Sequence, residues 1–305
     1  MKNRIISLIM LLLTAMIWGF AFVAQVAGTN YIGSLTMCGA RFLLATVALV
    51  PVILIFEKGR STPQQRKDTV FASLITGVIL FLASIFQQYG IQYTQSAGIS
   101  GFITGLYTVF IPIVCFVLFK QKTGINVIIG AICAIFGLFL LCYRPGDGFH
   151  FGLGELLLLI GAFFWTAHVI VIDRLGKKAR PLRFSMGQFA VCAVLGIIGA
   201  LIFEESSMGA LLDAKWAILY CGIMSSGVAY TLQIMAQRRC DPTMAAIVFS
   251  SESMFSAIGG VIFRIDSIAL IGYVGCAFML AGIVLSQIKF GKRTRTEEPL
   301  QAKEK

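Results

Sequence analysis

The sequence predicts an all-α integral membrane protein with ten transmembrane helices. Hydrophobic residues make up 58% of the 305 positions, and charged residues make up 13%, against about 25% in a typical soluble domain. Most apolar runs reach about 20 residues, the length with which a helix crosses a ~30 Å hydrocarbon core. Lysine and arginine lie mainly in the short connections between these runs. The pattern indicates a membrane protein along its whole length, with the lipid bilayer as its surroundings.

The predicted spans follow one another through short connections. The first apolar run continues for about 20 residues without a small-residue cleavage site, so we interpret it as a retained span rather than a signal peptide. The basic segment 289–305 is too polar to pack, and we expect a disordered tail. The expected spans are 5–24, 33–56, 69–91, 98–119, 124–142, 152–172, 183–203, 214–236, 243–263 and 267–288.

The net charge of +11 is distributed along the chain in a way that predicts orientation. Basic residues concentrate in the termini and in alternate connections, and the other connections hold only Arg144, Lys215 and Arg264. By the positive-inside rule, both termini are expected in the cytoplasm and the protein in the plasma membrane. The basic residues form no separate domain that could follow a phosphate backbone, so nucleic acid is not an expected partner.

The eight cysteines form no CxxC pair, and most lie within apolar runs. There they behave as small hydrophobic residues. We therefore expect no metal site, no disulfide framework and no cofactor.

The two halves of the chain, 1–143 and 144–288, resemble each other. The offset that aligns Trp18 with Trp165 also places Arg41-Phe42 on Gln188-Phe189. Each half is predicted to hold five spans, an odd number, so the second half would enter the membrane inverted. Inverted repeats are typical of transporters that bind solute near the membrane midplane, where the halves meet.

Glu252 stands out within the predicted span Thr243–Phe263. A charge at bilayer depth costs about 2.5–3.5 kcal/mol on insertion scales, so it should face protein or a water-filled cavity. Desolvation disfavours the charged form of a carboxylate. Glu252 could therefore carry a proton during transport, or it could be a carboxylate fixed by hydrogen bonds or by a cation. The corresponding stretch Ile99–Phe119 places Thr108 at this position, so the charge has no counterpart in the first half.

Arg41, within the second span, has two interpretations that the sequence leaves open. It could form an ion pair with Glu252, or it could hold a substrate carboxylate through a bidentate contact. Other polar and aromatic side chains within spans could line a cavity or bond to neighbouring helices. The candidate cavity residues are Trp18, Arg41, Gln87, Trp165, His168, Gln188, Tyr230, Gln233, Ser251 and Glu252. Gly101 and Gly105 form a GxxxG pair, which we interpret as close helix packing within one chain.

Several short motifs resemble those of the EamA family of the drug/metabolite transporter superfamily. They are Ile17-Trp18-Gly19-Phe20 in the first span, Ala40-Arg41-Phe42 in the second, and Ser251–Ala257 in the ninth. The chain departs from the family pattern at Ser253, where a proline is usual, and at Lys120-Gln121 and Arg264-Ile265, where Gly-Glu is frequent. The resemblance implies a ten-helix transporter of small metabolites, often an exporter of amino acids or related compounds.

The expected function is a secondary transporter that moves a small organic solute by alternating access, with proton coupling through Glu252. The first alternative is a facilitator without ion coupling. A more distant alternative is a membrane enzyme or a lipid-handling protein. Its nearest approach to a catalytic cluster is Glu204-Glu205 with Asp213, which we interpret as a solvated loop. No nucleotide-binding or nucleophile motif is present, so an enzyme is not expected. Substrate identity, transport direction and oligomeric state stay open.

Overall fold

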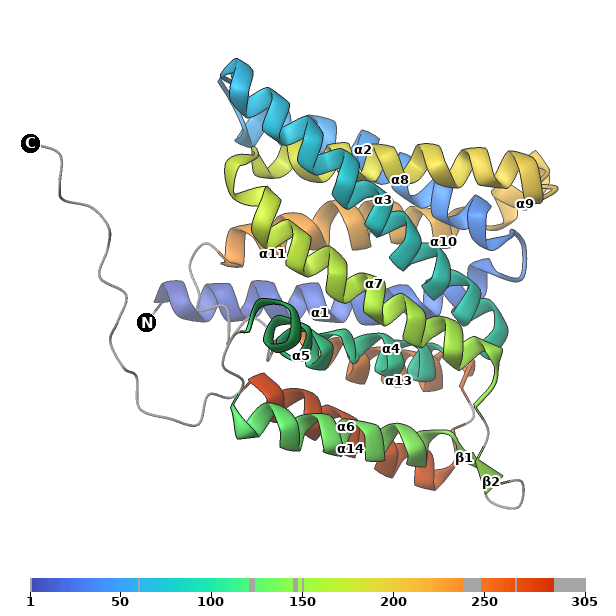
Figure 1. Ribbon diagram of the computed structural model, residues 1–305. Coiled ribbons are helices and arrows are strands. Elements are labelled where there is room, and N and C mark those ends of the chain that lie inside the picture. Colours follow the sequence, from blue (N-terminus) through green and yellow to red (C-terminus); the bar gives the residue numbers. More distant parts are fainter. Residues whose placement is uncertain are drawn as a thin grey trace, which may run out of the picture.

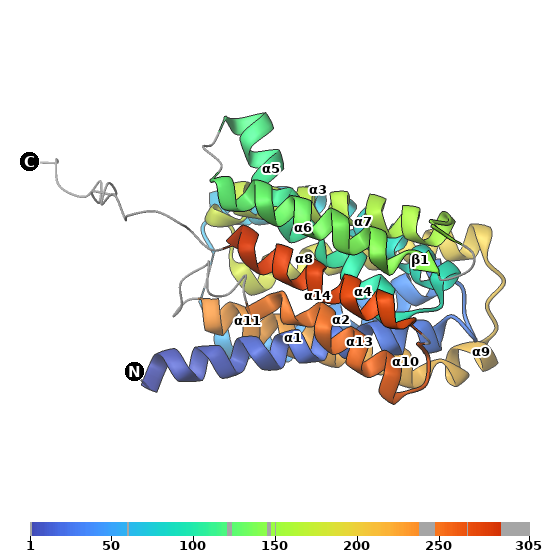
Figure 2. The ribbon, with the colours of Figure 1, turned by 90° about the horizontal axis from the view of Figure 1, so that it is seen from below.

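The computed structural model describes residues 2–59, 61–120, 124–144, 148–149, 151–237, 248–266 and 268–287. Within these ranges the chain forms a bundle of helices that run back and forth between two ends (Figure 1, Figure 2). The main helices are α1 (Lys2–Gly28), α2 (Ser34–Phe56), α3 (Pro63–Thr94), α4 (Ala97–Gly105), α5 (Tyr107–Phe119), α6 (Ile125–Leu141), α7 (Leu153–Leu175), α8 (Pro181–Phe203), α10 (Lys215–Leu219), α11 (Tyr230–Gln237), α13 (Ser251–Ile262) and α14 (Leu270–Gln287).

The described helices are long and apolar enough for a multi-pass membrane protein. Six helical stretches qualify as spans: Ile5–Gly28, Ser34–Phe56, Pro63–Thr94, Ala97–Phe119, Leu153–Leu175 and Pro181–Phe203. Two shorter apolar helices are Ile125–Leu141 and Leu270–Ser286. Large apolar side chains also point outward, among them Leu54 at 69% exposure and Val117 at 66%. Such a surface suits contact with lipid rather than with water.

Four details differ from a simple row of continuous helices. The predicted span 98–119 is interrupted at Leu106, where one tightened turn separates α4 from α5. The predicted span 214–236 contains a π-helix, η2 (Tyr220–Ala229), between α10 and α11. A short helix α9 (Met208–Asp213) and the antiparallel pair β1 (Tyr143–Arg144) and β2 (Gly148–Phe149) lie in connections; a 3₁₀ turn, η1 (Gly176–Lys178), follows α7. Positions 243–247 and the predicted tail lie outside the described residues.

We call the end where α1 begins the basic end, because Lys58, Arg66, Arg174, Arg180 and Arg183 lie in or beside its connections. It is on the left in Figure 1. The opposite end holds the β1–β2 pair and α9, on the right in the same view.

The helix contacts follow a two-repeat plan. α2 packs on α8, α4 on α13 and α6 on α14, and each of these pairs joins equivalent helices of the two halves. α3 packs on α7, just as its counterparts η2 and α11 pack on α1. Figures 1 and 2 both show α6 and α14 side by side. Their backbones touch at Gly130 with Gly282 and at Gly137 with Gly275, where a Cβ atom would collide with the facing carbonyl.

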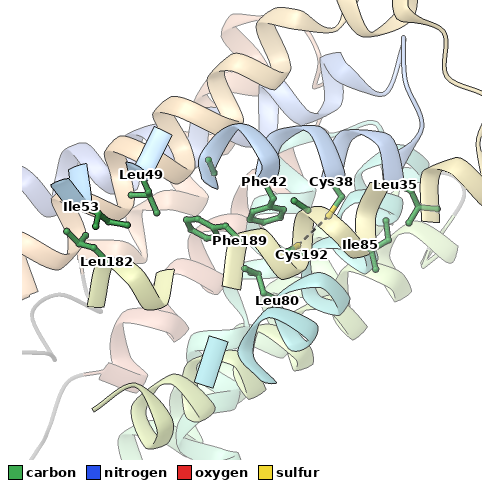
Figure 3. Close-up of a cluster of buried hydrophobic side chains, with 12 residues drawn as sticks. Leu35, Cys38, Phe42, Leu49, Ile53, Leu80, Ile85, Leu182, Phe189 and Cys192 are labelled. Carbon is green, nitrogen blue, oxygen red and sulfur yellow. Dashed lines mark hydrogen bonds between the residues drawn. The ribbon is translucent and has the colours of Figure 1, made fainter. Parts of the chain in front are cut away.

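The largest apolar cluster lies between α2, α3 and α8 (Figure 3). Phe42 and Phe189, which the repeat alignment places at equivalent positions, face each other with ring centroids 5.5 Å apart. The thiols of Cys38 and Cys192 lie 3.9 Å apart in the same layer. Aromatic contact and close packing hold α2 and α8 together along their length.

Two carboxylates join α2 and α8 at both ends. Glu204, directly after α8, accepts hydrogen bonds from the backbone N–H groups of Leu35 and Thr36 in the first turn of α2, each at 2.8 Å. Glu57, directly after α2, accepts from Leu182 and Arg183 in the first turn of α8, each at 3.1 Å. Each helix therefore supplies an acceptor for the free N–H groups of the other. Our interpretation of Glu204 as part of a solvated loop is wrong, because its carboxylate caps a helix.

A third carboxylate caps a helix N-terminus at the end of the bundle that holds the β1–β2 pair. Asp266, in the connection before α14, accepts from the backbone N–H groups of Ala97 and Gly98 at the start of α4, at 3.0 and 2.7 Å. Carboxylates at helix N-termini also interact favourably with the helix dipole. All three contacts hold helix ends that a membrane protein must not leave unsatisfied.

Replacement of Glu204 by alanine should destabilise the fold. The change leaves two backbone donors of α2 without their acceptor, and we expect a loss of about 1–2 kcal/mol. Thermal unfolding in detergent measures it, with the neighbouring exposed Glu205→Ala as the matched control. Equal melting temperatures for the two variants would contradict the capping role.

Candidate functional site

A cavity of about 490 Å³ lies at the centre of the bundle, between the two halves. Its lining reaches Asp173, Gly176 and Pro181 at the basic end, and includes no residue from the connections at the opposite end. Hydrogen bonds join helix ends at that opposite end, including Ser34 Oγ of α2 to Gln92 of α3 at 2.6 Å and Gln95, the C-cap of α3, to Thr29 at 3.1 Å. Among the described residues, the cavity lining thus extends to the basic end and not to the opposite end.

The structure brings together most of the residues that the sequence singled out. The cavity is lined by Trp18, Arg41, Gln87, Trp165, His168, Gln188, Tyr230, Gln233 and Glu252. Ser251 is outside this set, and its hydroxyl donates to the carbonyl of Val248 at 2.6 Å. Contact with a substrate stays a prediction for all of them.

Arg41 is buried, with 7% of its surface exposed, on the cavity side of α2. Its Nη1 donates to Oε1 of Gln25 at 2.6 Å, and its guanidinium carbon lies 4.7 Å from the ring centroid of Phe42. Its Nε is buried and has no hydrogen-bond partner among the described residues. A buried donor without a partner costs free energy, and this one belongs to a group suited to bind a carboxylate.

Glu252 lies in the first turn of α13 and lines the same cavity. Within the described part of the chain its carboxylate has no hydrogen-bond or ion-pair partner, and it forms no ion pair with Arg41. The ion-pair alternative for Arg41 is therefore not realised in this structure. One cation and one carboxylate face the same space while each remains able to bind something else.

The two equivalent tryptophans have different environments. The indole N–H of Trp18 donates to the carbonyl of Ser225 at 3.0 Å, and its ring lies edge-on to that of Tyr230, with centroids 5.5 Å apart. The indole N–H of Trp165 is buried and has no partner in the part of the chain that the structure describes, and its ring centroid lies 5.6 Å from that of His168. The repeat thus places one satisfied and one unsatisfied donor on the cavity.

Hydrogen bonds fix the remaining polar side chains of the wall. His168 Nε2 and Gln188 Oε1 are 2.9 Å apart, which links α7 to α8. Gln87 Nε2 donates to the hydroxyl of Thr104 at 3.3 Å, which links α3 to α4. Such contacts hold the wall in a defined shape before any solute binds.

The π-helix η2 is fastened to α1 beside the cavity. Tyr220 donates its hydroxyl to the carbonyl of Ile17 at 3.1 Å, and Trp18 donates to Ser225. π-helical turns recur at functional sites. Here the segment contributes Ser225 and Ser226 to the cavity lining. Sequence patterns alone carried no signal for it.

Sequence reasoning also missed Gln25, Thr104, Tyr107 and Asp173, which line the cavity. Gln25 could have been found, because it lies seven residues after Trp18 and therefore on the same face of α1. Asp173 sits beside basic residues at a helix end, and the same pattern is common on solvated surfaces.

Ser253, which stands where the EamA pattern usually has proline, has a specific role. Its hydroxyl donates to the carbonyl of Gly101 at 2.9 Å. Gly101 and Gly105 leave space for Ser256 and Ser253 of α13, since Cβ atoms on these glycines would collide with the serine hydroxyls. The GxxxG pair thus serves close packing within one chain, as the sequence predicted.

Comparison with known proteins identifies the family to which this architecture belongs. The model of the EamA-like transporter family matches residues 5–143 and 152–287, once for each half of the chain. The chain belongs to the EamA-like transporter family. The resemblance to the drug/metabolite transporter superfamily is confirmed, and the protein is a transporter rather than an enzyme.

Curated relatives agree with this assignment. An uncharacterised transporter of Archaeoglobus fulgidus is 24% identical, with 92% of this chain and 85% of that protein covered. The uncharacterised transporter YetK of Bacillus subtilis is 28% identical, with 82% and 77% covered. The threonine/homoserine exporter RhtA of Escherichia coli is 22% identical, with 59% and 61% covered. A crystal structure with 16% identity shares the fold, with a TM-score of 0.67 over 92% of this chain and 96% of the other.

The two tryptophans allow a matched test of the site geometry. Trp18→Phe removes a satisfied indole donor and should cost about 1 kcal/mol more than Trp165→Phe, which removes an unsatisfied one. Thermal unfolding of the two variants in detergent measures the difference. A larger loss for Trp165→Phe would contradict the assigned environments.

Proposed function

We propose that the protein is a secondary transporter that exports a small organic metabolite, an amino acid or a related compound, by alternating access. One observation carries the proposal: Arg41 and Glu252 face one cavity without pairing with each other, and the described lining of that cavity extends to one end of the bundle. Arg41 would bind a carboxylate through its guanidinium group. A relative named as a threonine/homoserine exporter supports both the substrate class and the direction.

The proposed architecture has ten spans in two inverted repeats, 1–143 and 144–288, with both termini in the cytoplasm of a plasma-membrane protein. The packing of equivalent helices from the two halves against each other, α2 on α8, α4 on α13 and α6 on α14, supports the repeats. Basic residues at one end support the orientation, which would make the present cavity open to the cytoplasm. The second state would then open the opposite end by rearranging one repeat against the other.

We propose Glu252 as the group that couples transport to protons. A carboxylate that lines a cavity and has no hydrogen-bond or ion-pair partner among the described residues would be free to take up and release a proton during transport. The favoured form would change with substrate occupancy and with the end to which the cavity opens. An uncoupled facilitator would need no such group.

Flux in proteoliposomes tests the coupling. Wild-type protein should move its substrate faster under a pH gradient, and Glu252→Gln should lose that dependence because the amide cannot ionise. The exposed carboxylate of Glu205 provides the control, and Glu205→Gln should behave as wild type. Unchanged gradient-driven flux in Glu252→Gln would refute proton coupling at this residue, and no gradient effect in wild type would favour the facilitator.

The role of Arg41 has its own test, once a metabolite-retention screen has identified the substrate. Arg41→Lys keeps the positive charge but loses the planar two-donor geometry. We expect an increase in KM of about ten-fold or more, equivalent to about 1.4 kcal/mol. An unchanged KM would exclude Arg41 as a carboxylate ligand.

A further inference from the structure

A second hollow lies on the lipid-facing side of the bundle. It has a volume of about 450 Å³ and is enclosed by α2, α3 and α8 at the basic end. These three helices pack on one another. Most of its lining is apolar: Val50, Ile53, Leu54, Val70, Leu74, Met186 and Val191. We call it the lipid-side groove.

The polarity of the groove changes along its length. Arg66 and Arg183 line it near the first turns of α3 and α8, together with the hydroxyl side chains of Ser61 and Thr69. Leu74 and Val191 each lie eight residues further along the same helices, about 12 Å deeper at 1.5 Å per residue. The groove is thus cationic at the membrane surface and apolar at the depth of acyl chains.

Of the two arginines of the groove, Arg183 forms an ion pair with Glu57, whereas Arg66 forms none among the described residues. The groove lining includes no acidic residue. Glu57, the nearby carboxylate, lies 3.5 Å from Nε of Arg183 and 3.8 Å from Nε of Arg180. The Nη atoms of Arg180 donate to the carbonyls of Glu57, Lys58 and Gly59 and to Ser61. Arg180 and Arg183 share the carboxylate of Glu57, so these three residues keep one net positive charge; Arg183 is 42% exposed and Arg66 is exposed.

We propose that the lipid-side groove is a binding site for an anionic phospholipid of the leaflet at the basic end. The phosphate would lie between Arg66 and Arg183, and one acyl chain would follow the apolar floor. Basic pockets between transmembrane helices bind such headgroups in membrane proteins. A zwitterionic lipid would gain the apolar contacts but not the net charge, and a free phosphate would gain only the charge.

The groove shares α8 with the central cavity. Arg183, Met186 and Gly187 line the groove, whereas Pro181, Phe184 and Ser185 line the cavity. The first turns of α8 therefore face the groove on one side and the central cavity on the other. A lipid in the groove would brace these turns against movement.

Lipid binding to the purified protein in detergent tests the proposal. Native mass spectrometry or thermal stabilisation would compare phosphatidylglycerol with phosphatidylcholine of the same chain length. Wild-type protein should prefer phosphatidylglycerol. Arg66→Gln with Arg183→Gln should weaken its binding about thirty-fold, at about five-fold for each charge. Arg180 still neutralises Glu57 in this variant, so the fold should persist.

The control removes the same net charge from the same end of the molecule. Lys67→Gln with Lys178→Gln changes residues that do not line the groove, and binding should stay within about two-fold of wild type. Equal losses in both double variants would reduce the effect to diffuse surface attraction and overturn the proposal. Equal stabilisation by phosphatidylcholine would also overturn the proposal. Competition by free glycerol phosphate at the concentration at which the lipid binds would overturn it as well. Because these measurements record no transport, they stand whether or not the proposed substrate class is correct.

Discussion

The fold depends on satisfying the free backbone groups of helices that end close to a low-dielectric medium. Glu57 and Glu204 meet this need reciprocally, since each follows one of the helices α2 and α8 and caps the other. A helix end without an acceptor costs several kcal/mol in hydrocarbon. The two helices therefore cannot slide or separate without exposing four N–H groups, and the apolar cluster between them adds to this cost. Because the pair joins both halves of the chain, it forms the fixed wall on which the cavity is built.

The scaffold is doubled, but the chemistry on it is not. In the repeat alignment Gln188 is equivalent to Arg41, and Thr108 is equivalent to Glu252. Neither the cation nor the carboxylate therefore has a charged counterpart in the other half. Trp18 and Trp165 are equivalent by sequence, yet only Trp18 has a partner for its N–H. Duplication supplies two similar packing arrangements at low cost. The single charges and the donors that lack partners among the described residues then make the two sides of the cavity wall chemically different, and a buried polar group without a partner is costly.

The sequence predicted the class, the apolar helices and most of the cavity residues, because the membrane restricts both length and composition. It left open whether Arg41 and Glu252 pair. In the structure, Arg41 donates instead to Gln25, a residue that the sequence reasoning missed. The π-helix at Tyr220–Ala229 and the interruption at Leu106 depend on packing between distant helices. The caps escaped prediction for the same reason, since a glutamate after a helix reads as a solvated residue until its partner helix is known.

The first turns of α8 show how these constraints meet. Pro181, Phe184, Ser185 and Gln188 recur at the spacing of one helix face, and that face lines the cavity. Arg183, Met186 and Gly187 occupy the remaining face beside lipid. Glu57 fixes the same turn through the N–H groups of Leu182 and Arg183. The cap fixes this turn between the cavity and the groove, so the turn has little freedom to move independently of α2. Closure of the cavity at the basic end would then require movement of α7 or of the helices around α1 against this wall.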